Sequence, residues 1–286
     1  MNLPFKKVGV LGCGTMGSGI TQVCAQSGYH VVVLETTLAL VDGGIKRIAD
    51  FLDKGLQKGK VTAAQKEQTL SRIQGTTYMD DLEECDIVVE AIIENADEKK
   101  KVFAQLDEIV KKDCIFASNT SCLSITHLAA STKREDKFCG LHFFSPAQLM
   151  KLVEVVRALG TSEKTIKTAC GFVSSTGKEF IVCKDTPGFV VNRLLIPYVN
   201  QAIQALDDGL ASKEDIETAL KLGLGYPMGP YTLMDNVGID IHMHASEAIY
   251  EELHDKDFAS PPLLRRMVNA GKLGKKSGEG FYSYKK

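Results

Sequence analysis

A short glycine-rich segment near the start of the chain places the strongest constraint on its fold. The segment reads Gly12-Cys13-Gly14-Thr15-Met16-Gly17. An apolar, β-branched run precedes it at residues 8–11, and apolar residues follow it at helical spacing, at Ile20, Val23 and Cys24, before Gly28. The pattern predicts a strand, a tight turn and a helix.

Each part of this segment has a physical role if it binds a dinucleotide. Gly12 permits the tight turn, Gly14 lets the backbone approach a pyrophosphate, and Gly17 lets the helix pack closely on the strand. The N–H groups at the start of the helix, where Thr15 and Met16 lie, attract phosphate oxygens. A glycine turn alone is weak evidence, but here a strand, a helix and a second strand at residues 30–34 occur in the required order.

The second strand ends at Glu35, roughly 20 residues after Gly12, where an acid hydrogen-bonds the adenosine ribose. A carboxylate repels the 2′-phosphate of NADP, and residues 36–38 contain no arginine to receive one. The sequence therefore predicts NAD as the cofactor.

Strand-like and helical segments alternate along residues 1–186. Residues 38–60 and a second amphipathic stretch from Thr62 form a helical pair in place of a single crossover helix. Further strands are predicted at residues 75–78, 86–91, 114–117, 137–144, 152–156 and 180–182, with helices at 97–110, 124–130 and 165–176. This alternation predicts an α/β fold with a Rossmann-type, doubly wound and mostly parallel sheet, whose ligands lie at the carboxyl ends of the strands.

The chain changes character near residues 185–187 and becomes helical. Residues 189–206 form a helix that Pro197 is expected to bend. Ser212 begins another helix, which we expect to end at Gly223, and helical patterns follow at 231–235, 239–253 and 263–270. We therefore expect a NAD-binding domain at residues 1–186 and a smaller all-α domain at 187–286.

The composition argues against several classes of partner. The 286 residues carry 34 basic and 36 acidic side chains, so no overall field favours nucleic acid or an anionic membrane. The eight cysteines form no Cys-x-x-Cys pair, and we expect neither disulfides nor a metal, although Cys13 and Cys122 are candidates for reactive thiols. With no segment resembling a signal peptide or a membrane span, we expect a cytoplasmic protein.

Two ionisable residues, His142 and Glu154, interrupt otherwise apolar strands. If residues 145–151 form a loop that doubles back, the two side chains face each other and each offsets the cost of burying the other. The pair has two possible roles, as a structural ion pair or as an acid/base dyad. In the second, the carboxylate fixes the imidazole tautomer and leaves the other nitrogen to take a proton from an alcohol. The dinucleotide-binding sheet favours the second role.

Lys54 and Lys58 are four residues apart in the first arm of the helical pair and share one face. The residues alone leave two interpretations open, a solvated basic face or an anchor for an anionic substrate tail.

Several longer motifs resemble those of the 3-hydroxyacyl-CoA dehydrogenases, nearly from end to end of the chain. They are Ala117-Ser118-Asn119-Thr120-Ser121, Gly140-Leu141-His142-Phe143-Phe144-Ser145-Pro146, Met150-Lys151-Leu152-Val153-Glu154-Val155, Asp185-Thr186-Pro187-Gly188-Phe189-Val190-Val191-Asn192-Arg193, Pro227-Met228-Gly229-Pro230 and residues 274–282. The resemblance implies NAD-dependent interconversion of (S)-3-hydroxybutanoyl-CoA and acetoacetyl-CoA by a homodimer built largely through the helical domain.

The resemblance also implies roles for single residues. His142 is the general base and Glu154 orients it, while Ser121 and Asn192 hold the reacting oxygen, Ser121 lying next to both cofactor and substrate. Lys54 and Lys58 meet the CoA moiety. The implied cofactor contacts outside the glycine turn and Glu35 come from Glu94, Lys99, Ser121, Ser145 and Lys276.

Four positions depart from the family's usual residues. Ser145 stands where asparagine is usual, so its cofactor contact is expected to be shorter or water-mediated. Cys122 replaces a serine and Glu35 an aspartate. Asp53 stands where a serine often meets the substrate, and its charge is expected to weaken the basic patch for CoA.

Two rival functions remain open at this stage. A related NAD-dependent dehydrogenase could act on a free hydroxy acid or sugar acid. Such an enzyme needs a cation near His142 to bind the substrate carboxylate, and the candidates are Lys151 and Arg193. A non-catalytic NAD-binding protein could keep the fold, but the intact set of His142, Glu154, Ser121 and Asn192 argues against it.

Overall fold

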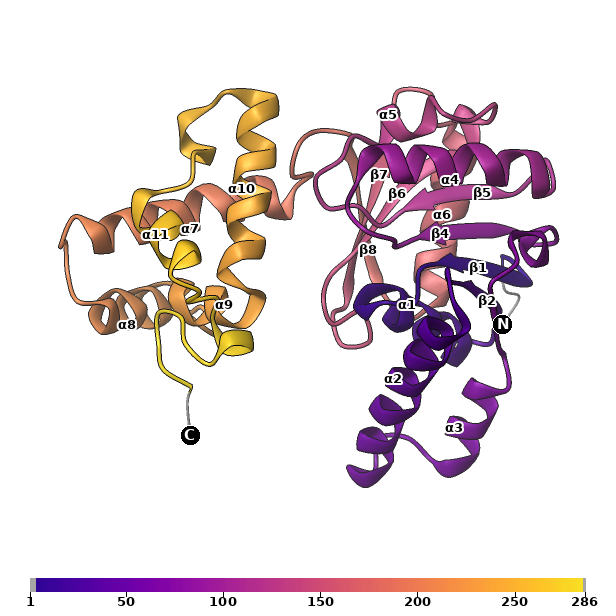
Figure 1. Cartoon of the computed structure of the whole chain (residues 1–286), viewed down its shortest axis with the longest axis horizontal. Coiled ribbons are helices and arrows are strands. Elements are labelled where there is room, and N and C mark those ends of the chain that lie inside the picture. The colour runs from indigo at the N-terminus through magenta and orange to yellow at the C-terminus, as the bar shows by residue number, and fades with distance from the viewer. Residues whose placement is uncertain (1–3, 285–286) are drawn as a thin grey trace. The chain divides into compact units, whose positions relative to one another are not determined.

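The protein is described here by a computed structural model covering residues 4–284. The chain divides into two compact units, Met1–Thr186 and Pro187–Lys286 (Figure 1). The first unit is built on a sheet and the second is helical.

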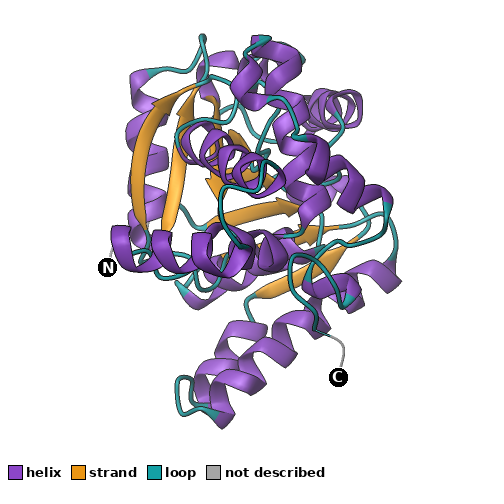
Figure 2. Cartoon of the chain, turned by 90° about the vertical axis from the view of Figure 1, so that its left-hand side faces the viewer, coloured by secondary structure: helices purple, strands orange, loops and turns teal. Residues whose placement is uncertain are grey.

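Within residues 4–186, eight strands form one sheet in the order β3-β2-β1-β4-β5-β6-β7-β8. Strands β1 to β6 pair in parallel, β7 runs antiparallel to β6, and β8 is parallel to β7. The strands, orange in Figure 2, are β1 (Lys7–Leu11), β2 (His30–Leu34), β3 (Ile73–Thr76), β4 (Ile87–Glu90), β5 (Ile115–Ser118), β6 (Phe138–Phe143), β7 (Leu152–Arg157) and β8 (Glu179–Lys184). The predicted doubly wound, mostly parallel sheet is confirmed.

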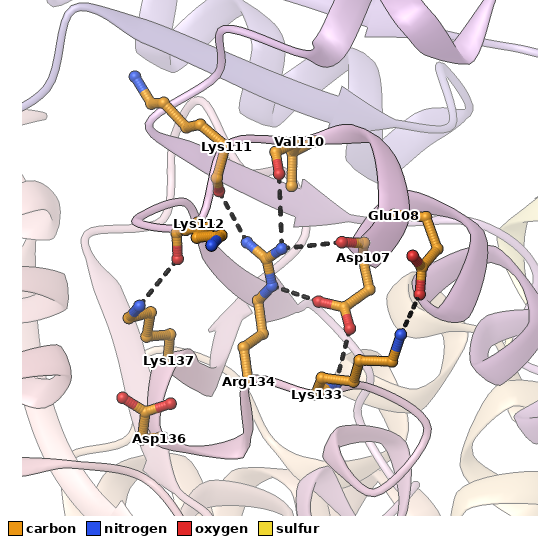
Figure 3. A pocket seen from close by; sticks show the side chains of 9 residues that line it. All are labelled: Asp107, Glu108, Val110, Lys111, Lys112, Lys133, Arg134, Asp136 and Lys137. Carbon is orange, nitrogen blue, oxygen red and sulfur yellow. Dashed lines mark hydrogen bonds and ion pairs between the residues drawn. The ribbon is translucent and has the colours of Figure 1, made fainter.

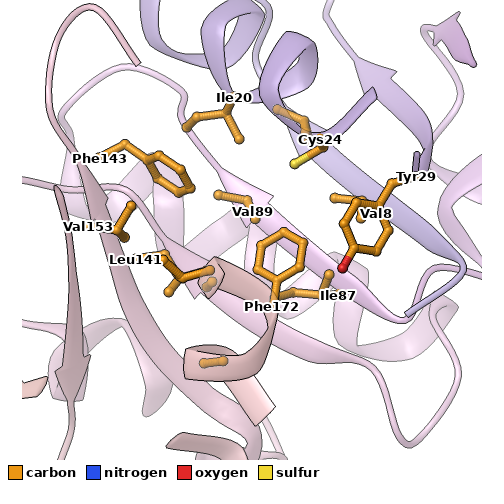
Figure 4. Close-up of a cluster of buried hydrophobic side chains, with 14 of the residues drawn as sticks. Val8, Ile20, Cys24, Tyr29, Ile87, Val89, Leu141, Phe143, Val153 and Phe172 are labelled. Carbon is orange, nitrogen blue, oxygen red and sulfur yellow. The ribbon is translucent and has the colours of Figure 1, made fainter. Parts of the chain in front are cut away.

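Helices cover both faces of this sheet. Ile20 of α1 (Thr15–Gln26) and Phe172 of α6 (Glu163–Ser175) belong to one buried cluster with alternate strand residues such as Ile87 and Val89 (Figure 4). Phe116 of β5 points to the opposite face of the sheet, and its ring centroid lies 5.4 Å from that of Phe103 in α4 (Ala96–Ile109). Side chains alternate between the faces of a strand, so a sheet covered on both sides needs apolar residues at successive positions.

The helical pair between β2 and β3 consists of α2 (Leu38–Gln57) and α3 (Ala63–Leu70), and it extends away from the sheet in Figure 1. The Thr37 side chain caps the first helix by accepting a hydrogen bond from Leu40 N. Thr62 and Gln65 form a reciprocal capping box at the start of the second. The remaining helix of this unit is α5 (Ile125–Ala129), with short 3₁₀ turns η1 (Met79–Leu82) and η2 (Glu135–Lys137).

Several predicted boundaries differ from the observed ones by one or two residues, and two of these differences have a clear consequence. The third strand was expected at residues 75–78, but β3 covers Ile73–Thr76, and Tyr78 is exposed. The helix that begins after Ser212 does not end at Gly223 but continues to Leu224. Gly225 ends it because this residue adopts the left-handed conformation, with φ +69°, that terminates helices and that glycine tolerates.

The second unit contains five helices among residues 187–284, together with 3₁₀ turns η3 (Lys256–Phe258) and η4 (Lys275–Ser277). The helices are α7 (Val191–Asp207), which contains Pro197, α8 (Lys213–Leu224), α9 (Pro230–Val237), α10 (Ile239–Leu253) and α11 (Pro262–Asn269). Val199, Ile203, Tyr231 and Leu264 are fully buried members of its core.

A buried polar chain crosses this helical core. His242 donates from Nε2 to Asn200 Oδ1 at 2.9 Å, since the Asn200 amide nitrogen donates to Ser246 Oγ at 2.9 Å. Ser246 in turn donates to the carbonyl of Phe258 at 2.6 Å. Burial lowers the pKa of His242 from 6.5 to about 4, because the charged imidazolium loses its hydration there.

This lowered pKa predicts acid sensitivity of the helical unit. Between pH 6.5 and about 4 the unfolded chain binds a proton at His242 that the folded chain does not, so stability falls as the pH falls through this window. The lowering of the His242 pKa corresponds to about 3 kcal/mol in the free energy of unfolding. Urea unfolding followed by circular dichroism should show a shallower loss of stability on acidification in His242→Gln than in the parent protein. His244→Gln, which changes an exposed histidine of the same helix, is the matched control; equal acid sensitivity in all three proteins would contradict the assignment.

Candidate active site

The glycine turn has the geometry that a pyrophosphate needs. Gly12 has φ +87°, and a Cβ there would lie 2.7 Å from the carbonyl oxygen of Ala91. A Cβ on Gly17 would lie 2.0 Å from Gly12 O, so the helix and strand approach as closely as predicted. The space beside Gly14 is open, with no atom of the described residues within 4 Å of its ideal Cβ. Helix α1 begins at Thr15, next to this opening. The turn therefore fits a dinucleotide phosphate.

Glu35 lies at the same turn. Its Oε1 accepts from Cys13 N at 2.7 Å and its Oε2 from Thr36 N at 3.1 Å, which fixes the carboxylate beside the glycines. The sequence indicated no cation nearby, but Arg47 of α2 donates to Cys13 O. This approach of α2 requires the glycine at position 44, because a Cβ on Gly44 would lie 2.0 Å from Cys13 Sγ. No local pattern around residue 47 signals this approach.

The reactive thiols expected at Cys13 and Cys122 are not supported. Burial raises the pKa of Cys13 to about 11 and that of Cys122 to about 12. Both side chains are therefore thiols rather than nucleophilic thiolates near neutral pH.

The pairing of His142 with Glu154 is present. The antiparallel register of β6 and β7 places the two residues directly opposite each other, and His142 Nδ1 lies 2.7 Å from Glu154 Oε2. The two residues are 4% and 0% exposed. A carboxylate can only accept a hydrogen bond, so the Nδ1 nitrogen carries a proton and Nε2 is left to exchange one.

Ser121 completes this arrangement from the loop after β5. Its Oγ lies 3.0 Å from His142 Nε2, so the imidazole is held between a carboxylate and a hydroxyl. Both the β5 and β6 ends lie at the carboxyl edge of the parallel strands, where the glycine turn also lies. An alcohol at this position could lose its proton to Nε2.

Glu94 and Lys99 lie behind Ser121. Glu94 Oε1 accepts from Ser121 N at 3.0 Å and from the Thr120 hydroxyl. Lys99 Nζ lies 3.1 Å from Glu94 Oε2 and 2.5 Å from Glu90 Oε1, and the Lys99 side chain is 1% exposed. The lysine ammonium is thus engaged by two carboxylates, which the sequence did not indicate.

Ser145 lies in the loop between β6 and β7, and a cis peptide bond joins it to Pro146. Two contacts hold this loop. Lys178 Nζ donates to the carbonyls of Ala147 and Met150, both at 2.6 Å, and Gln148 Nε2 donates to Gln22 Oε1 of α1 at 3.2 Å. Burial lowers the pKa of Lys178.

Lys54 and Lys58 are both exposed, one in the last turn of α2 and the other at its C-cap. Asp53, expected to oppose them, forms an ion pair with Lys66 of α3 at 2.5 Å. The pair spans the two arms of the helical hairpin, so the carboxylate charge is already balanced.

The other two expected site residues belong to the second unit. Asn192 lies in the first turn of α7. Lys276, in η4, donates to Asp240 Oδ2 at 2.7 Å. Although burial of Asp240 acts in the opposite direction, the hydrogen bond and charge of Lys276 hold the pKa of that carboxyl below its usual value.

A hollow of about 500 Å³ lies away from this site, around the end of α4 and the segments that enter β5 and β6 (Figure 3). Arg134 spans it, donating to the Asp107 carboxylate and to the carbonyls of Lys111 and Cys114. These contacts pair a buried charge and satisfy carbonyls at the end of a helix, as a structural arginine does. The hollow lies at the amino edge of the strands, opposite the glycine turn.

No helix among residues 4–284 has both the length and the apolar character needed to cross a membrane.

Comparisons with known proteins agree with this geometry. Residues 7–186 match the model of the 3-hydroxyacyl-CoA dehydrogenase NAD binding domain, and residues 188–284 match that of the 3-hydroxyacyl-CoA dehydrogenase C-terminal domain. The chain is 47% identical to a probable 3-hydroxybutyryl-CoA dehydrogenase of Deinococcus radiodurans, over 97% of this chain and all of the relative. It is 46% identical to the mitochondrial hydroxyacyl-coenzyme A dehydrogenase of Sus scrofa, over 98% of this chain and 91% of the relative.

Among solved structures, the (S)-3-hydroxybutyryl-CoA dehydrogenase of Ralstonia eutropha superimposes with a TM-score of 0.95 at 45% identity, covering 99% of this chain and all of the other. Two consecutive domain models and full-length relatives at this level of identity leave one assignment. The chain belongs to the 3-hydroxyacyl-CoA dehydrogenase family.

Proposed function

We propose that this protein interconverts (S)-3-hydroxybutanoyl-CoA and acetoacetyl-CoA with NAD and NADH. The observation that carries the proposal is the buried His142, which lies 2.7 Å from Glu154 on one side and 3.0 Å from Ser121 on the other, at the edge of a dinucleotide-binding sheet. The near full-length similarity to 3-hydroxybutyryl-CoA dehydrogenases supports the choice of substrate.

In this reaction the protein moves a proton while a hydride leaves the same alcohol. When bound, NAD⁺ supplies the hydride acceptor. His142 Nε2 takes the hydroxyl proton, and Glu154 stabilises the imidazolium that forms. Ser121 and Asn192 would donate hydrogen bonds to the reacting oxygen, which gains carbonyl character as the proton and hydride depart. In the reverse direction the imidazolium returns the proton.

Among the residues proposed to hold NAD, the glycine turn and Glu35 are proposed on their chemistry, and the others on the resemblance to the family. The glycine turn with Thr15 and Met16 would receive the pyrophosphate, and Glu35 would accept from the ribose hydroxyls. Glu94, Ser121, Ser145 and Lys276 would line the rest of the cofactor site. Lys99 would contribute by holding Glu94, because its own side chain is 1% exposed.

We also propose a cytoplasmic homodimer that associates through its helical unit. That unit exposes large apolar side chains, among them Leu194, Leu210 and Leu222, that association could cover. All eight cysteines are free, which suits a reducing compartment.

The direct test is NADH oxidation with acetoacetyl-CoA, compared with free acetoacetate. We expect turnover of the CoA ester well above that of the free acid; preference for the free acid would favour the rival hydroxy-acid dehydrogenase. Absence of turnover with both, together with retained NADH binding, would favour a non-catalytic NAD-binding protein.

The dyad makes a sharper prediction. His142→Ala should lower kcat on the order of 10²–10⁴-fold, since a positioned acid–base group is lost, with little change in NADH affinity. Glu154→Gln keeps the shape but removes the charge that stabilises the imidazolium, so kcat should also fall. If the pair were only structural, both variants would lose thermal stability while folded molecules kept their turnover. Near-normal kcat in folded His142→Ala would overturn the mechanism.

The basic end of α2 gives a separate prediction. Lys54 and Lys58 should attract the CoA phosphates through exposed, screened contacts worth about 0.5–1 kcal/mol each. Replacing both by alanine should raise KM for acetoacetyl-CoA, more at low salt, and leave KM for NADH unchanged. Lys46→Ala, an exposed lysine nearer the start of α2, is the control.

Asp53→Ser tests the balance of charge at the same place. It should release Lys66 from its ion pair and modestly lower KM for acetoacetyl-CoA at low salt.

An unchanged KM in the variant that replaces both Lys54 and Lys58, measured at low salt, would show that the CoA phosphates bind elsewhere.

A further inference from the structure

A buried ion pair lies at the end of β4 that the proposed reaction does not use. Glu90 is fully buried, and its carboxylate accepts from Lys99 Nζ at 2.5 Å, from Ser118 Oγ at 2.5 Å and from Ile92 N at 2.7 Å. Burying a carboxylate and an ammonium is costly, and stability alone rarely requires it, since apolar residues often serve as well. Whether this pair has a role besides stability depends on what its members contact beyond each other.

Two routes lead from Glu90 to the loop after β5. In the first, Lys99 Nζ also contacts Glu94 Oε2 at 3.1 Å, and Glu94 Oε1 accepts from Ser121 N at 3.0 Å and from the Thr120 hydroxyl. In the second, the Ser118 hydroxyl donates a hydrogen bond to Glu90, and Ser118 Oγ accepts one from Thr120 N at 3.2 Å. Both routes reach Thr120, and the first also reaches the main-chain N–H of Ser121.

The charges explain why Glu90 is needed. One ammonium faces two carboxylates, and the Glu94 side chain is 44% exposed while that of Lys99 is 1% exposed. An exposed glutamate has many rotamers, and Glu94 keeps the one that binds Ser121 because a fixed cation lies beside it. Glu90 accepts a hydrogen bond from that cation, and the hydrogen bonds from Ser118 Oγ and Ile92 N fix the Glu90 carboxylate in place.

We propose that Glu90 is a positioning residue for the reaction, acting through Lys99, Glu94 and Ser118 to hold the Ser121 hydroxyl 3.0 Å from His142 Nε2. The inference rests on the proposed function, in which Ser121 binds the reacting oxygen.

A double-mutant cycle between Glu90 and Ser121 tests it. Glu90→Gln keeps the size of the side chain but removes its charge and replaces one of its two accepting oxygens with a donating amide group. In the otherwise unchanged protein it should lower kcat for acetoacetyl-CoA reduction on the order of 10–100-fold, as expected when a reacting group is misplaced. In a Ser121→Ala background the same change should alter kcat by less than about twofold, because there is no hydroxyl left to position.

Asp107→Asn is the matched control. Asp107 is also a buried acid, lies on the same helix α4 as Lys99, and pairs with Arg134 in the hollow of Figure 3. Its loss should lower thermal stability as Glu90→Gln does, while kcat per folded molecule stays unchanged. If Glu90→Gln does not fold, Glu90→Asp, which keeps the charge but withdraws it by one methylene, replaces it in the cycle with the same expectations.

A second readout does not depend on activity. Amide hydrogen exchange, measured by mass spectrometry on peptides covering residues 118–123, should be faster in Glu90→Gln and unchanged in Asp107→Asn. Equal losses of kcat in both Ser121 backgrounds, or unchanged exchange in Glu90→Gln, would overturn the positioning role. If the parent protein itself fails to reduce acetoacetyl-CoA, the proposed function fails, and the exchange measurement still decides whether Glu90 holds the loop.

Discussion

The antiparallel pairing of β6 with β7 is the constraint on which the proposed chemistry depends. The described strands on the other side of β6 all run parallel, and their polar end residues meet at one edge. Reversing the chain once, in the loop after Phe143, brings a second strand back beside the first with Glu154 opposite His142. A parallel neighbour would need a long crossover and would supply its own edge residue from another loop. The hairpin instead places acid and base opposite each other within the core, where neither can be solvated and each requires the other.

The sequence predicted much of this because the relevant signals are local. The order Gly12, Gly14, Gly17 and then Glu35 specifies a strand, a turn and a helix within a short stretch, and it led to the cofactor. His142 and Glu154 were found because each breaks an apolar strand, and a loop of suitable length separates them. A charged residue in an apolar run is a strong signal, since burial makes it costly unless it has a partner.

The features that were missed depend on packing between distant segments. Arg47 reaches Cys13 O only because α2 lies against the turn at Gly44, and Asp53 is balanced by Lys66 only because the two helices fold back on each other. The burial of Lys99 between Glu90 and Glu94 likewise follows from how α4 packs on the sheet. The end of α8 was misplaced because two glycines, Gly223 and Gly225, stand close together, and only the backbone conformation distinguishes them.

The loop that joins His142 to Glu154 is fixed in an unusual way. Lys178 holds it by donating to two main-chain carbonyls, those of Ala147 and Met150. Hydrogen bonds to carbonyls do not depend on which side chains the loop carries, so substitutions within it leave this attachment intact. A change in length would not be tolerated equally, because it would shift the register that sets the acid opposite the base. Replacing a side chain of the loop, such as that of Ser145, would therefore leave acid and base facing each other, whereas inserting or deleting a residue would separate them.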